Sequence, residues 1–344
     1  MAELGPVVDA IRARRFWRDR LDNEYAAVAA RLRSSYANVL PGLEAQRATF
    51  ITELDRLARE RRDTGTQLLT AAEVRQLDAY NSFIVSIQAD MDSWAREIRD
   101  TTLREAAEVG IANGVDAARG MVGQIGAAWN QVDPEALAQQ IGYLDSAAIT
   151  DIWDFWGARA ISNPGGVGLD DMILAFTAIG RNPREIADRI SEWFDLPYTW
   201  AENHIRTLNL WSYRAASHEA YKRNSDVVRN WMWVATLDNR VCPACLSMHG
   251  TIHTHDEILN GHHRCRCTPV PIVAGSTWWR DYQTGDDWLR DQDDEMVRNI
   301  LGKRGSEAWN NNEFRLPDVR GYYNHTVFGR MLRAKSWGSI LGGN

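Results

Sequence analysis

Apolar side chains recur at three- and four-residue spacing along the first sixty residues, with charged positions between them. From Val7 to about Arg62, positions such as Leu43 and Phe50 follow the period of an α-helix. This pattern predicts one long amphipathic arm that is interrupted near Pro41. A second helix is expected after Thr70, whose hydroxyl and Glu73 match a capping box, and it should run past Trp94. The two helices are predicted to fold back as a hairpin.

The segment from residue 106 to residue 129 is rich in glycine and alanine. Gly110 and Gly114 have the spacing of a membrane dimer motif, but Glu108, Asp116 and Arg119 are too costly for a lipid-spanning segment. Tight helix packing in a bundle is therefore the favoured interpretation. Short helices are expected to follow, with start signals at Asp133-Pro134, at Asn182-Pro183-Arg184-Glu185, and at Thr199-Trp200-Ala201-Glu202 before a helix that reaches about Arg223.

The pattern changes at residues 230–236, where large and smaller side chains alternate before the turn-forming pair Asp238-Asn239. This run predicts a strand, and residues 269–273 predict a second, whose prolines confine it to a sheet edge. A helix is expected from Trp288 to Leu301, followed by polar turns and a short amphipathic piece. The predicted fold is mainly α with a small zinc-stapled β module (α+β), a long N-terminal helical arm or hairpin, a central helical bundle and C-terminal helices. The predicted segments are 1–130, 131–225, 226–275 and 276–344.

Composition narrows the class of protein. The chain has 344 residues, 44% of them hydrophobic and 25% charged, and a formal net charge of −7, so any contact with DNA should be local. No run of about 18 uncharged apolar residues is present, and the first residues lack the pattern of a signal peptide. We therefore expect a protein without membrane contact in a reducing cytoplasm, where clustered cysteines favour a metal over disulfides.

All four cysteines lie in two short clusters, Cys242-x-x-Cys245 and His262-x-x-Cys265-x-Cys267. Two such clusters can complete a four-coordinate zinc shell. The second half of the shell is either His262 with Cys265 or Cys265 with Cys267. We favour the first pair, with Cys267 packed nearby or ligating instead. A closed shell of this kind leaves no position for water, so the expected role of the zinc is structural.

Other charged and histidine-rich segments allow alternatives. The first helix carries five early arginines: Arg12, Arg14, Arg15, Arg18 and Arg20. These arginines can contact phosphate or an acidic partner, but a solvated helix face is the favoured interpretation. The acidic run from Asp281 to Glu295 is interpreted as a helix start. His255 and Asn260 beside the cysteines resemble a zinc-stapled HNH-like nuclease, but the segment from residue 253 to residue 263 is too short for a ββα unit. No common enzyme motif is present, so no catalytic residue is assigned and the protein is expected not to be an enzyme.

The flanks of the cysteine clusters resemble the phage Mu F-like minor head protein family, also called phage head morphogenesis proteins. The residues that carry the resemblance lie between about 170 and 275: Gly180, Ile186-Ala187, Arg206-Thr207, Trp233, Asp238, Cys242, Cys245, Gly250, His262 and Cys265-Arg266-Cys267. A weaker similarity continues through residues 287–292 and 300–302. Two positions depart from the family pattern: Leu208 replaces a glutamate, and His263-Arg264 replace a Pro-Asn pair.

The resemblance implies a low-copy structural component of the capsid interior, bound near the portal, that assists head assembly and DNA packaging or ejection. Its partners would be the portal and capsid proteins, with packaged double-stranded DNA as a further candidate through the early arginines. Its location would be the virion head, after assembly in the host cytoplasm. The alternative function is the HNH-like nuclease or a nucleic-acid-binding module.

Overall fold

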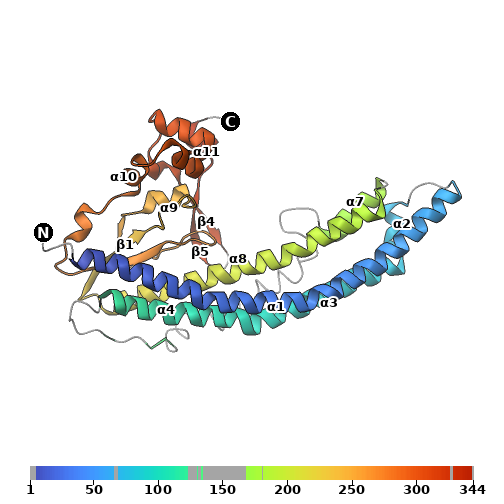
Figure 1. Ribbon diagram of the computed structural model, residues 1–344, viewed down its shortest axis with the longest axis horizontal. Helices are drawn as coiled ribbons and strands as arrows, with labels where there is room; N and C mark the ends of the chain where they lie inside the picture. Colours follow the sequence, from blue (N-terminus) through green and yellow to red (C-terminus); the bar gives the residue numbers. More distant parts are fainter. Residues whose placement is uncertain are drawn as a thin grey trace. The chain divides into compact units, whose positions relative to one another are not determined.

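A computed structural model of the chain describes residues 5–65, 69–122, 130, 133–134, 168–179, 181–325 and 328–342 (Figure 1). The described residues are mainly helical with a small amount of sheet, as predicted. They form two compact units. The first unit contains residues 1–25, 106–145 and 206–344, and the second contains residues 26–105 and 146–205. The four segments predicted from the sequence pattern stay a prediction.

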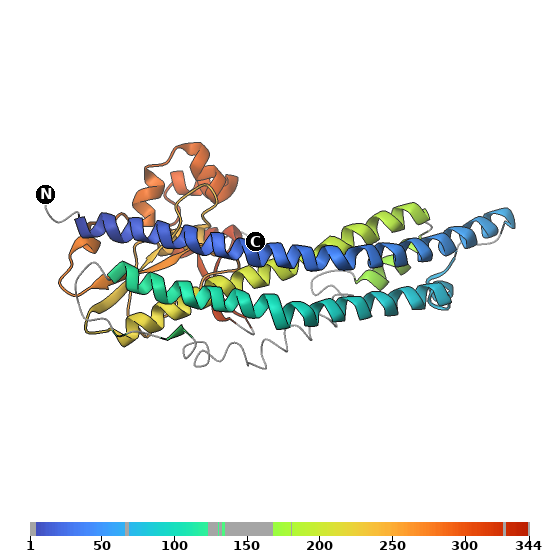
Figure 2. The ribbon, with the colours of Figure 1, turned by 60° about the horizontal axis from the view of Figure 1, so that its bottom comes forward.

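The first helix, α1 (Gly5–Asp63), is continuous, so the predicted interruption near Pro41 is wrong. Figure 2 shows it as one unbroken ribbon. A proline inside a helix removes one backbone hydrogen bond. In the second unit this loss is outweighed by burial on both sides of Pro41, where Tyr36 and Leu43 are core residues.

The predicted helical hairpin is present in the second unit. Phe50 of α1 stacks on Phe83 of α3 (Asp78–Ile98) with ring centroids 5.0 Å apart, and Tyr36 lies 4.8 Å from Trp94. In these two contacts the residue with the higher number in α1 meets the residue with the lower number in α3, so the two helices are antiparallel. The π-helical turn η1 (Arg99–Leu103) follows α3. Helix α7 (Leu169–Ala178) also lies wholly in this unit.

The predicted capping box is confirmed, but the helix that it starts is short. Thr70 and Glu73 exchange side-chain and backbone hydrogen bonds at the start of α2 (Ala71–Arg75). The expectation of a single helix from here past Trp94 is wrong. Leu77 has an extended backbone, which ends α2 and allows α3 to begin at Asp78.

Glycines bring α4 (Arg104–Val122) and α8 (Pro183–Arg223) into direct backbone contact, as the glycine-rich pattern predicted. A Cβ at Gly110 would lie 2.3 Å from the carbonyl oxygen of Asn209, and one at Gly114 would lie 2.3 Å from that of Tyr213. The Ser217 hydroxyl donates to the Gly114 carbonyl at 3.1 Å. The rest of the glycine-rich segment, with Gly123 and Gly126, lies outside the described residues.

Helix α8 runs without a break, so a separate helix starting at Thr199 is wrong. The Thr199 hydroxyl donates to the carbonyl of Asp195 at 3.1 Å, which is a bond to the preceding turn of the same helix and not a cap. The predicted start at Asn182-Pro183 is correct, because Pro183 is the first helical residue and the Asn182 side chain accepts from the Arg184 N–H. The helix predicted after Asp133-Pro134 falls almost wholly outside the described residues.

A three-stranded antiparallel sheet has the order β2-β1-β3, with β1 (Val228–Val234), β2 (Ile252–His253) and β3 (Thr268–Val273). Met232 pairs with Val270 and Trp233 with Pro269, so the proline-containing strand lies at the edge, as predicted. The sequence pattern did not predict the helix within this module. Helix α9 (Pro243–Met248) lies between β1 and β2, because Cys242 accepts a hydrogen bond at the N-cap and Pro243 suits the first helical position.

The C-terminal segment was predicted to be helical, but the described part of it also contains strands. Asp293 caps α11 (Asp294–Asn310) and thereby separates it from α10 (Gly285–Arg290), so the single helix predicted from Trp288 to Leu301 is wrong. Acidic residues do occupy the helix starts, as predicted. Strands β4 (Arg320–His325) and β5 (Gly329–Ala334) form an antiparallel hairpin that the sequence analysis missed. The remaining elements are η3 (Trp278–Asp281), η4 (Leu316–Val319) and α12 (Trp337–Leu341).

Candidate metal centre

The two cysteine clusters meet in the first unit at the start of α9. Cys242 is the N-cap residue of this helix, and its Sγ accepts a hydrogen bond from the backbone N–H of Cys245 at 3.2 Å. His262, Cys265 and Cys267 lie on the segment that leads into β3. The fold therefore brings all five predicted ligands to one place.

The donor atoms are close enough to share an ion. His262 Nε2 lies 3.1 Å from Cys242 Sγ and 3.2 Å from Cys245 Sγ, and Cys245 Sγ lies 3.6 Å from Cys265 Sγ. A tetrahedral zinc with Zn–S bonds of about 2.3 Å would place two sulfurs about 3.8 Å apart. Two overlapping groups could hold a metal ion, Cys242 with Cys245 and His262, and Cys245 with Cys265 and Cys267. Cys245 belongs to both groups and is therefore central.

The protonation preferences within the cluster also fit a cation. Hydrogen bonds with the Cys245 side chain and with His262 lower the pKa of Cys242 to about 5. Hydrogen bonds with Cys245 and Cys267 lower the pKa of Cys265, whereas the side-chain hydrogen bond with Cys242 raises that of Cys245 and burial raises that of Cys267. Closely spaced thiols cannot all ionise without a compensating positive charge. A divalent cation would supply that charge.

The orientation of His262 suits coordination through Nε2. Its Nδ1 lies 2.6 Å from the carbonyl oxygen of His263, which makes Nδ1 the protonated nitrogen and leaves the Nε2 lone pair facing the sulfurs. Burial lowers the pKa of His262, but hydrogen bonding to Cys242 and the charge of Cys265 outweigh burial and raise it to about 9. A cation placed among these thiolates would take the position of the imidazole proton.

Arginines hold the backbone of the second cluster. The buried guanidinium of Arg214 donates from Nε to the carbonyl of Cys267 at 3.1 Å and also donates to the carbonyl of Cys265. The carbonyl of Arg266 accepts from Arg18 and from the Thr236 hydroxyl. These donors fix the peptide groups between the ligands. The sequence analysis missed Arg214, and the signal available for it was a single charge among apolar residues in the middle of a long helix.

The segment carries three further constraints. The Arg266 guanidinium forms a bidentate pair with Asp238, with N···O distances of 2.5 and 2.6 Å. A Cβ at Gly261 would lie 2.3 Å from Cys265 Sγ, so only glycine fits beside the ligand. Thr207 accepts from the Arg264 N–H at 3.2 Å and lies 3.2 Å from His263 Nδ1. The replacement residues His263 and Arg264 are therefore tied to α8.

Two of the early arginines, Arg14 and Arg18, are largely internal, so the interpretation of a solvated helix face is wrong for these two. Arg14 donates to the carbonyl of Ala235 at 3.2 Å, Arg18 pairs with Asp22, and Arg20 pairs with Glu24 and Asp116. Burial lowers the pKa of Arg14 and of Arg18. Arg15 is exposed, and the side chain of Arg12 lies outside the described residues.

The loop histidines near the cysteines have separate hydrogen-bond partners. His249 Nδ1 accepts from the Ala235 N–H at 3.0 Å, and burial lowers its pKa to about 4. His253 lies 2.5 Å from a Glu257 carboxylate oxygen, and His255 lies 2.8 Å from the carbonyl of Val228. Within the described part of the chain, none of these three imidazoles belongs to a group of three potential metal ligands.

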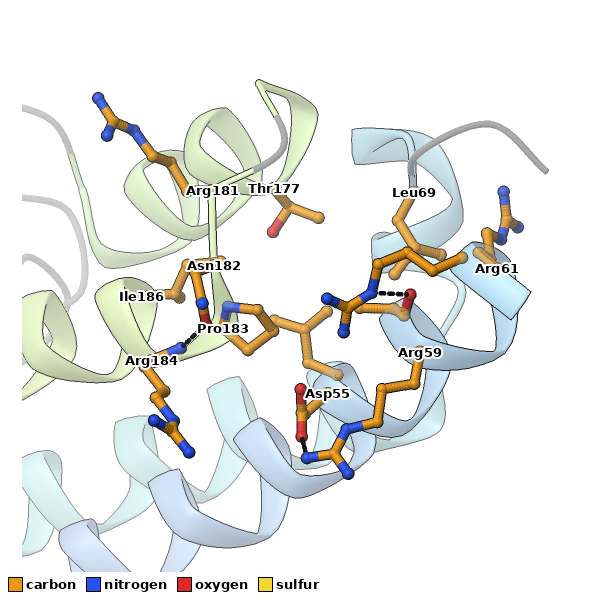
Figure 3. A pocket seen from close by; sticks show the side chains of 13 residues that line it. Asp55, Arg59, Arg61, Leu69, Thr177, Arg181, Asn182, Pro183, Arg184 and Ile186 are labelled. Atoms are coloured by element: carbon orange, nitrogen blue, oxygen red, sulfur yellow. Dashed lines mark hydrogen bonds and ion pairs between the residues drawn. The ribbon is translucent and has the colours of Figure 1, made fainter. Parts of the chain in front are cut away.

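The second unit contains a separate pocket of about 430 Å³ between the end of α1, the end of α7 and the start of α8 (Figure 3). Its floor is apolar and includes Leu54, Leu69 and Ile186. Five arginines line it: Arg59, Arg61, Arg62, Arg181 and Arg184. Arg59 pairs with Asp55 within the pocket, and Arg181 extends away from it (Figure 3). The charges therefore do not converge on one point.

Comparison with known proteins gives one finding. Residues 171–270 match the family described as Phage Mu protein F like protein. The match confirms the resemblance that the sequence motifs suggested over about residues 170 to 275, and it contains all five candidate ligands. No curated protein matches the chain, and no solved structure does. Among the described helices, none is both long enough and apolar enough to cross a membrane.

Proposed function

We propose that this chain is a phage minor head protein, a low-copy component of the capsid interior that is bound near the portal and assists head assembly. The observation that carries the proposal is the Mu F-like match over residues 171–270, within which the fold gathers the cysteine clusters. On this proposal the protein acts by holding partners together, in DNA packaging or ejection as well as in assembly. The portal and capsid proteins are its proposed partners, and it has no proposed catalytic residue.

We further propose that Cys242, Cys245, His262 and Cys265 hold a structural zinc ion. The donor distances, the orientation of His262 and the opposed thiol pKa directions support a cation here, and the sulfur and imidazole donors suit zinc. Cys267 would remain beside the shell as an unused fifth donor. The ion would join the start of α9 to the segment before β3, and so close the loop between β1 and β3.

The head-protein proposal is tested by quantitative peptide mass spectrometry on purified virions and empty procapsids of the phage or prophage that encodes the chain. A few copies per particle are expected, with the same copy number in procapsids if the protein enters during assembly. A matched preparation that lacks the gene should yield fewer complete heads. Absence of the protein from both kinds of particle would overturn the proposal, even if the metal centre proved correct.

A further inference from the structure

The pocket of the second unit contains none of the candidate metal ligands. Its volume of about 430 Å³ lies within the range of about 300–1,000 Å³ that is usual for binding pockets. The floor side chains of Leu54, Leu69 and Ile186 are 2%, 7% and 1% exposed, so packing holds them in place. Ile179, two residues before the lining residue Arg181, is 65% exposed and can add apolar contact. The pocket is therefore a preformed apolar recess.

Charge is distributed unevenly around this recess. The lining contains five arginines and a single acidic residue, Asp55. Three of the arginines have carboxylate partners, in the pairs Arg59–Asp55, Arg61–Glu73 and Arg181–Glu185. The other two, Arg62 and Arg184, are exposed and form no ion pair with any residue that the structure describes. The rim of the recess therefore carries uncompensated positive charge.

The two uncompensated arginines belong to different helices. Arg62 is in the last turn of α1, and Arg184 is in the first turn of α8. A helix dipole favours a cation at the C-terminal end and disfavours one at the N-terminal end. Arg62 therefore suits its position without a partner, whereas Arg184 does not. Figure 3 shows Arg61 on the α1 side of the pocket and Arg184 on the α8 side, so positive charge surrounds the recess and does not meet inside it.

We propose that this pocket binds an acidic segment of a protein partner. Apolar side chains of the segment enter the recess, and its carboxylates pair with Arg62 and Arg184. Protein interfaces combine an apolar anchor in a pocket with a polar rim, and arginine is enriched in them. A carboxylate accepts two parallel hydrogen bonds from one guanidinium. The carboxylate beside Arg184 also offsets the unfavourable position of this arginine at the start of α8.

Other anions match the pocket less well. A small anion would need several donors that point to one place, but the arginines lie on opposite sides of the recess. A nucleic-acid backbone supplies phosphates but no apolar group that could fill the recess. A peptide supplies both kinds of group, because its sequence can place carboxylates on either side of an apolar side chain.

The test is fluorescence anisotropy with the full-length protein and a labelled peptide of about 15 residues, at about 100 mM salt. The peptide carries leucines three or four residues apart, with glutamates between them, so that it has an apolar and an acidic face. A second peptide has serine in place of each leucine and keeps every glutamate. We expect the leucine peptide to bind about tenfold more tightly than the serine peptide, because only leucine side chains can fill the recess.

Two variants test the two parts of the site. Arg62→Glu with Arg184→Glu should weaken binding of the leucine peptide about tenfold, because each reversal replaces an attraction with a repulsion. The matched control, Arg33→Glu with Arg96→Glu, makes the same change in net charge at exposed positions outside the pocket and should change the affinity by less than about twofold. Ala58→Trp keeps the charge but fills the recess from a half-buried lining position, and it should also weaken binding about tenfold.

Any of the following results would overturn the proposal: no binding of the leucine peptide at about 1 mM, equal binding of the two peptides, an equal loss in the matched control, or unchanged affinity in a folded pocket variant. Tighter binding of a labelled DNA duplex through Arg62 and Arg184 would also overturn it and would indicate a nucleic-acid partner. Circular dichroism identifies the folded variants. If Ala58→Trp failed to fold, the charge reversal and the serine peptide would still decide. The proposal goes beyond the head-protein role and does not depend on it, because binding is measured with the isolated protein.

Discussion

The candidate metal centre of the first unit and the helical hairpin of the second unit differ in the kinds of side chain that meet in them. In the first, a short sheet and a one-and-a-half-turn helix are joined through thiols, an imidazole and buried arginines. In the second, α1 and α3 are joined by apolar contacts such as Phe50 on Phe83. On the zinc proposal, order in the first region depends on a ligand set as well as on its apolar core, whereas order in the second depends on buried apolar area alone. The two regions should therefore respond differently to the same perturbation.

The largest expected effect is loss of the metal. Cys245→Ser removes the donor common to both groups of potential ligands, and structural zinc can contribute roughly 10 kcal/mol to folding. We expect zinc content to fall from one ion per chain to none, with loss of the β1–β3 sheet and retention of the α1–α3 hairpin. Mass-spectrometric metal analysis and hydrogen exchange of the two regions measure this difference. A chelator should reproduce it in the wild-type protein.

Cys267→Ser is the matched control for the choice of ligands. With Cys267 as an unused donor, this variant should keep its zinc, whereas Cys265→Ser should lose it. The reverse result would assign the Cys265-x-Cys267 pair, or Cys267 alone, to the shell. Either result would leave the contrast between the two regions intact.

A cavity in the second unit should give an effect of intermediate size that is independent of metal. Phe50 is 1% exposed and stacks on Phe83. Phe50→Ala should lower the free energy of unfolding by about 3–5 kcal/mol, because it removes buried area and leaves a cavity. Denaturant unfolding followed by circular dichroism measures the loss, and zinc content should not change. A loss of zinc in this variant would show that the two regions are not independent.

A smaller effect is expected where α4 and α8 touch. Gly114→Ala places a methyl group 2.3 Å from the Tyr213 carbonyl and should destabilise the protein by about 1–3 kcal/mol. Gly42→Ala is the matched control, because its Cβ would meet only a side-chain oxygen of Asp90, at 3.8 Å. That control should be stabilising by up to about 1 kcal/mol, since alanine is the better helix former. Equal effects at the two sites would argue against close backbone packing.

The smallest effect concerns pH and the start of α2. Hydrogen bonds from the Thr70 backbone and the ion pair with Arg61 lower the pKa of Glu73 from 4.5 to about 2. A carboxylate with a lowered pKa stabilises the folded state fully above its unfolded pKa, and this stabilisation is lost as pH falls from about 4.5 through 2. Glu73→Gln should remove that part of the pH dependence, which NMR titration of the side chain and acid unfolding can follow. If the acid-unfolding curve of the wild-type protein showed no loss of stability in this pH range, the assignment to Glu73 would be wrong.

Several features were predictable from the sequence because neighbours a few residues apart decide them. The Thr70 capping box, the proline start of α8 and the edge position of β3 depend on residues within one turn or one strand. The Cys242-x-x-Cys245 spacing likewise places two thiols at one helix start. The continuity of α1 through Pro41 and of α8 through Pro197 was not predictable, because burial of neighbouring residues outweighs the local cost of a proline.

The sequence by itself determined the donor set, the mainly helical character and the family resemblance, since these depend on residue type and short spacing. Only the tertiary structure decided which charged side chains are bonded inside the protein and which remain exposed. Arg14 and Arg18 look like surface charges in the sequence but bond to carbonyls more than two hundred positions away, whereas Arg330 and Arg333 remain exposed on a hairpin that local pattern did not predict. The physical reason is that a charge is neutralised or left exposed by long-range contacts, and those contacts exist only once the chain has folded.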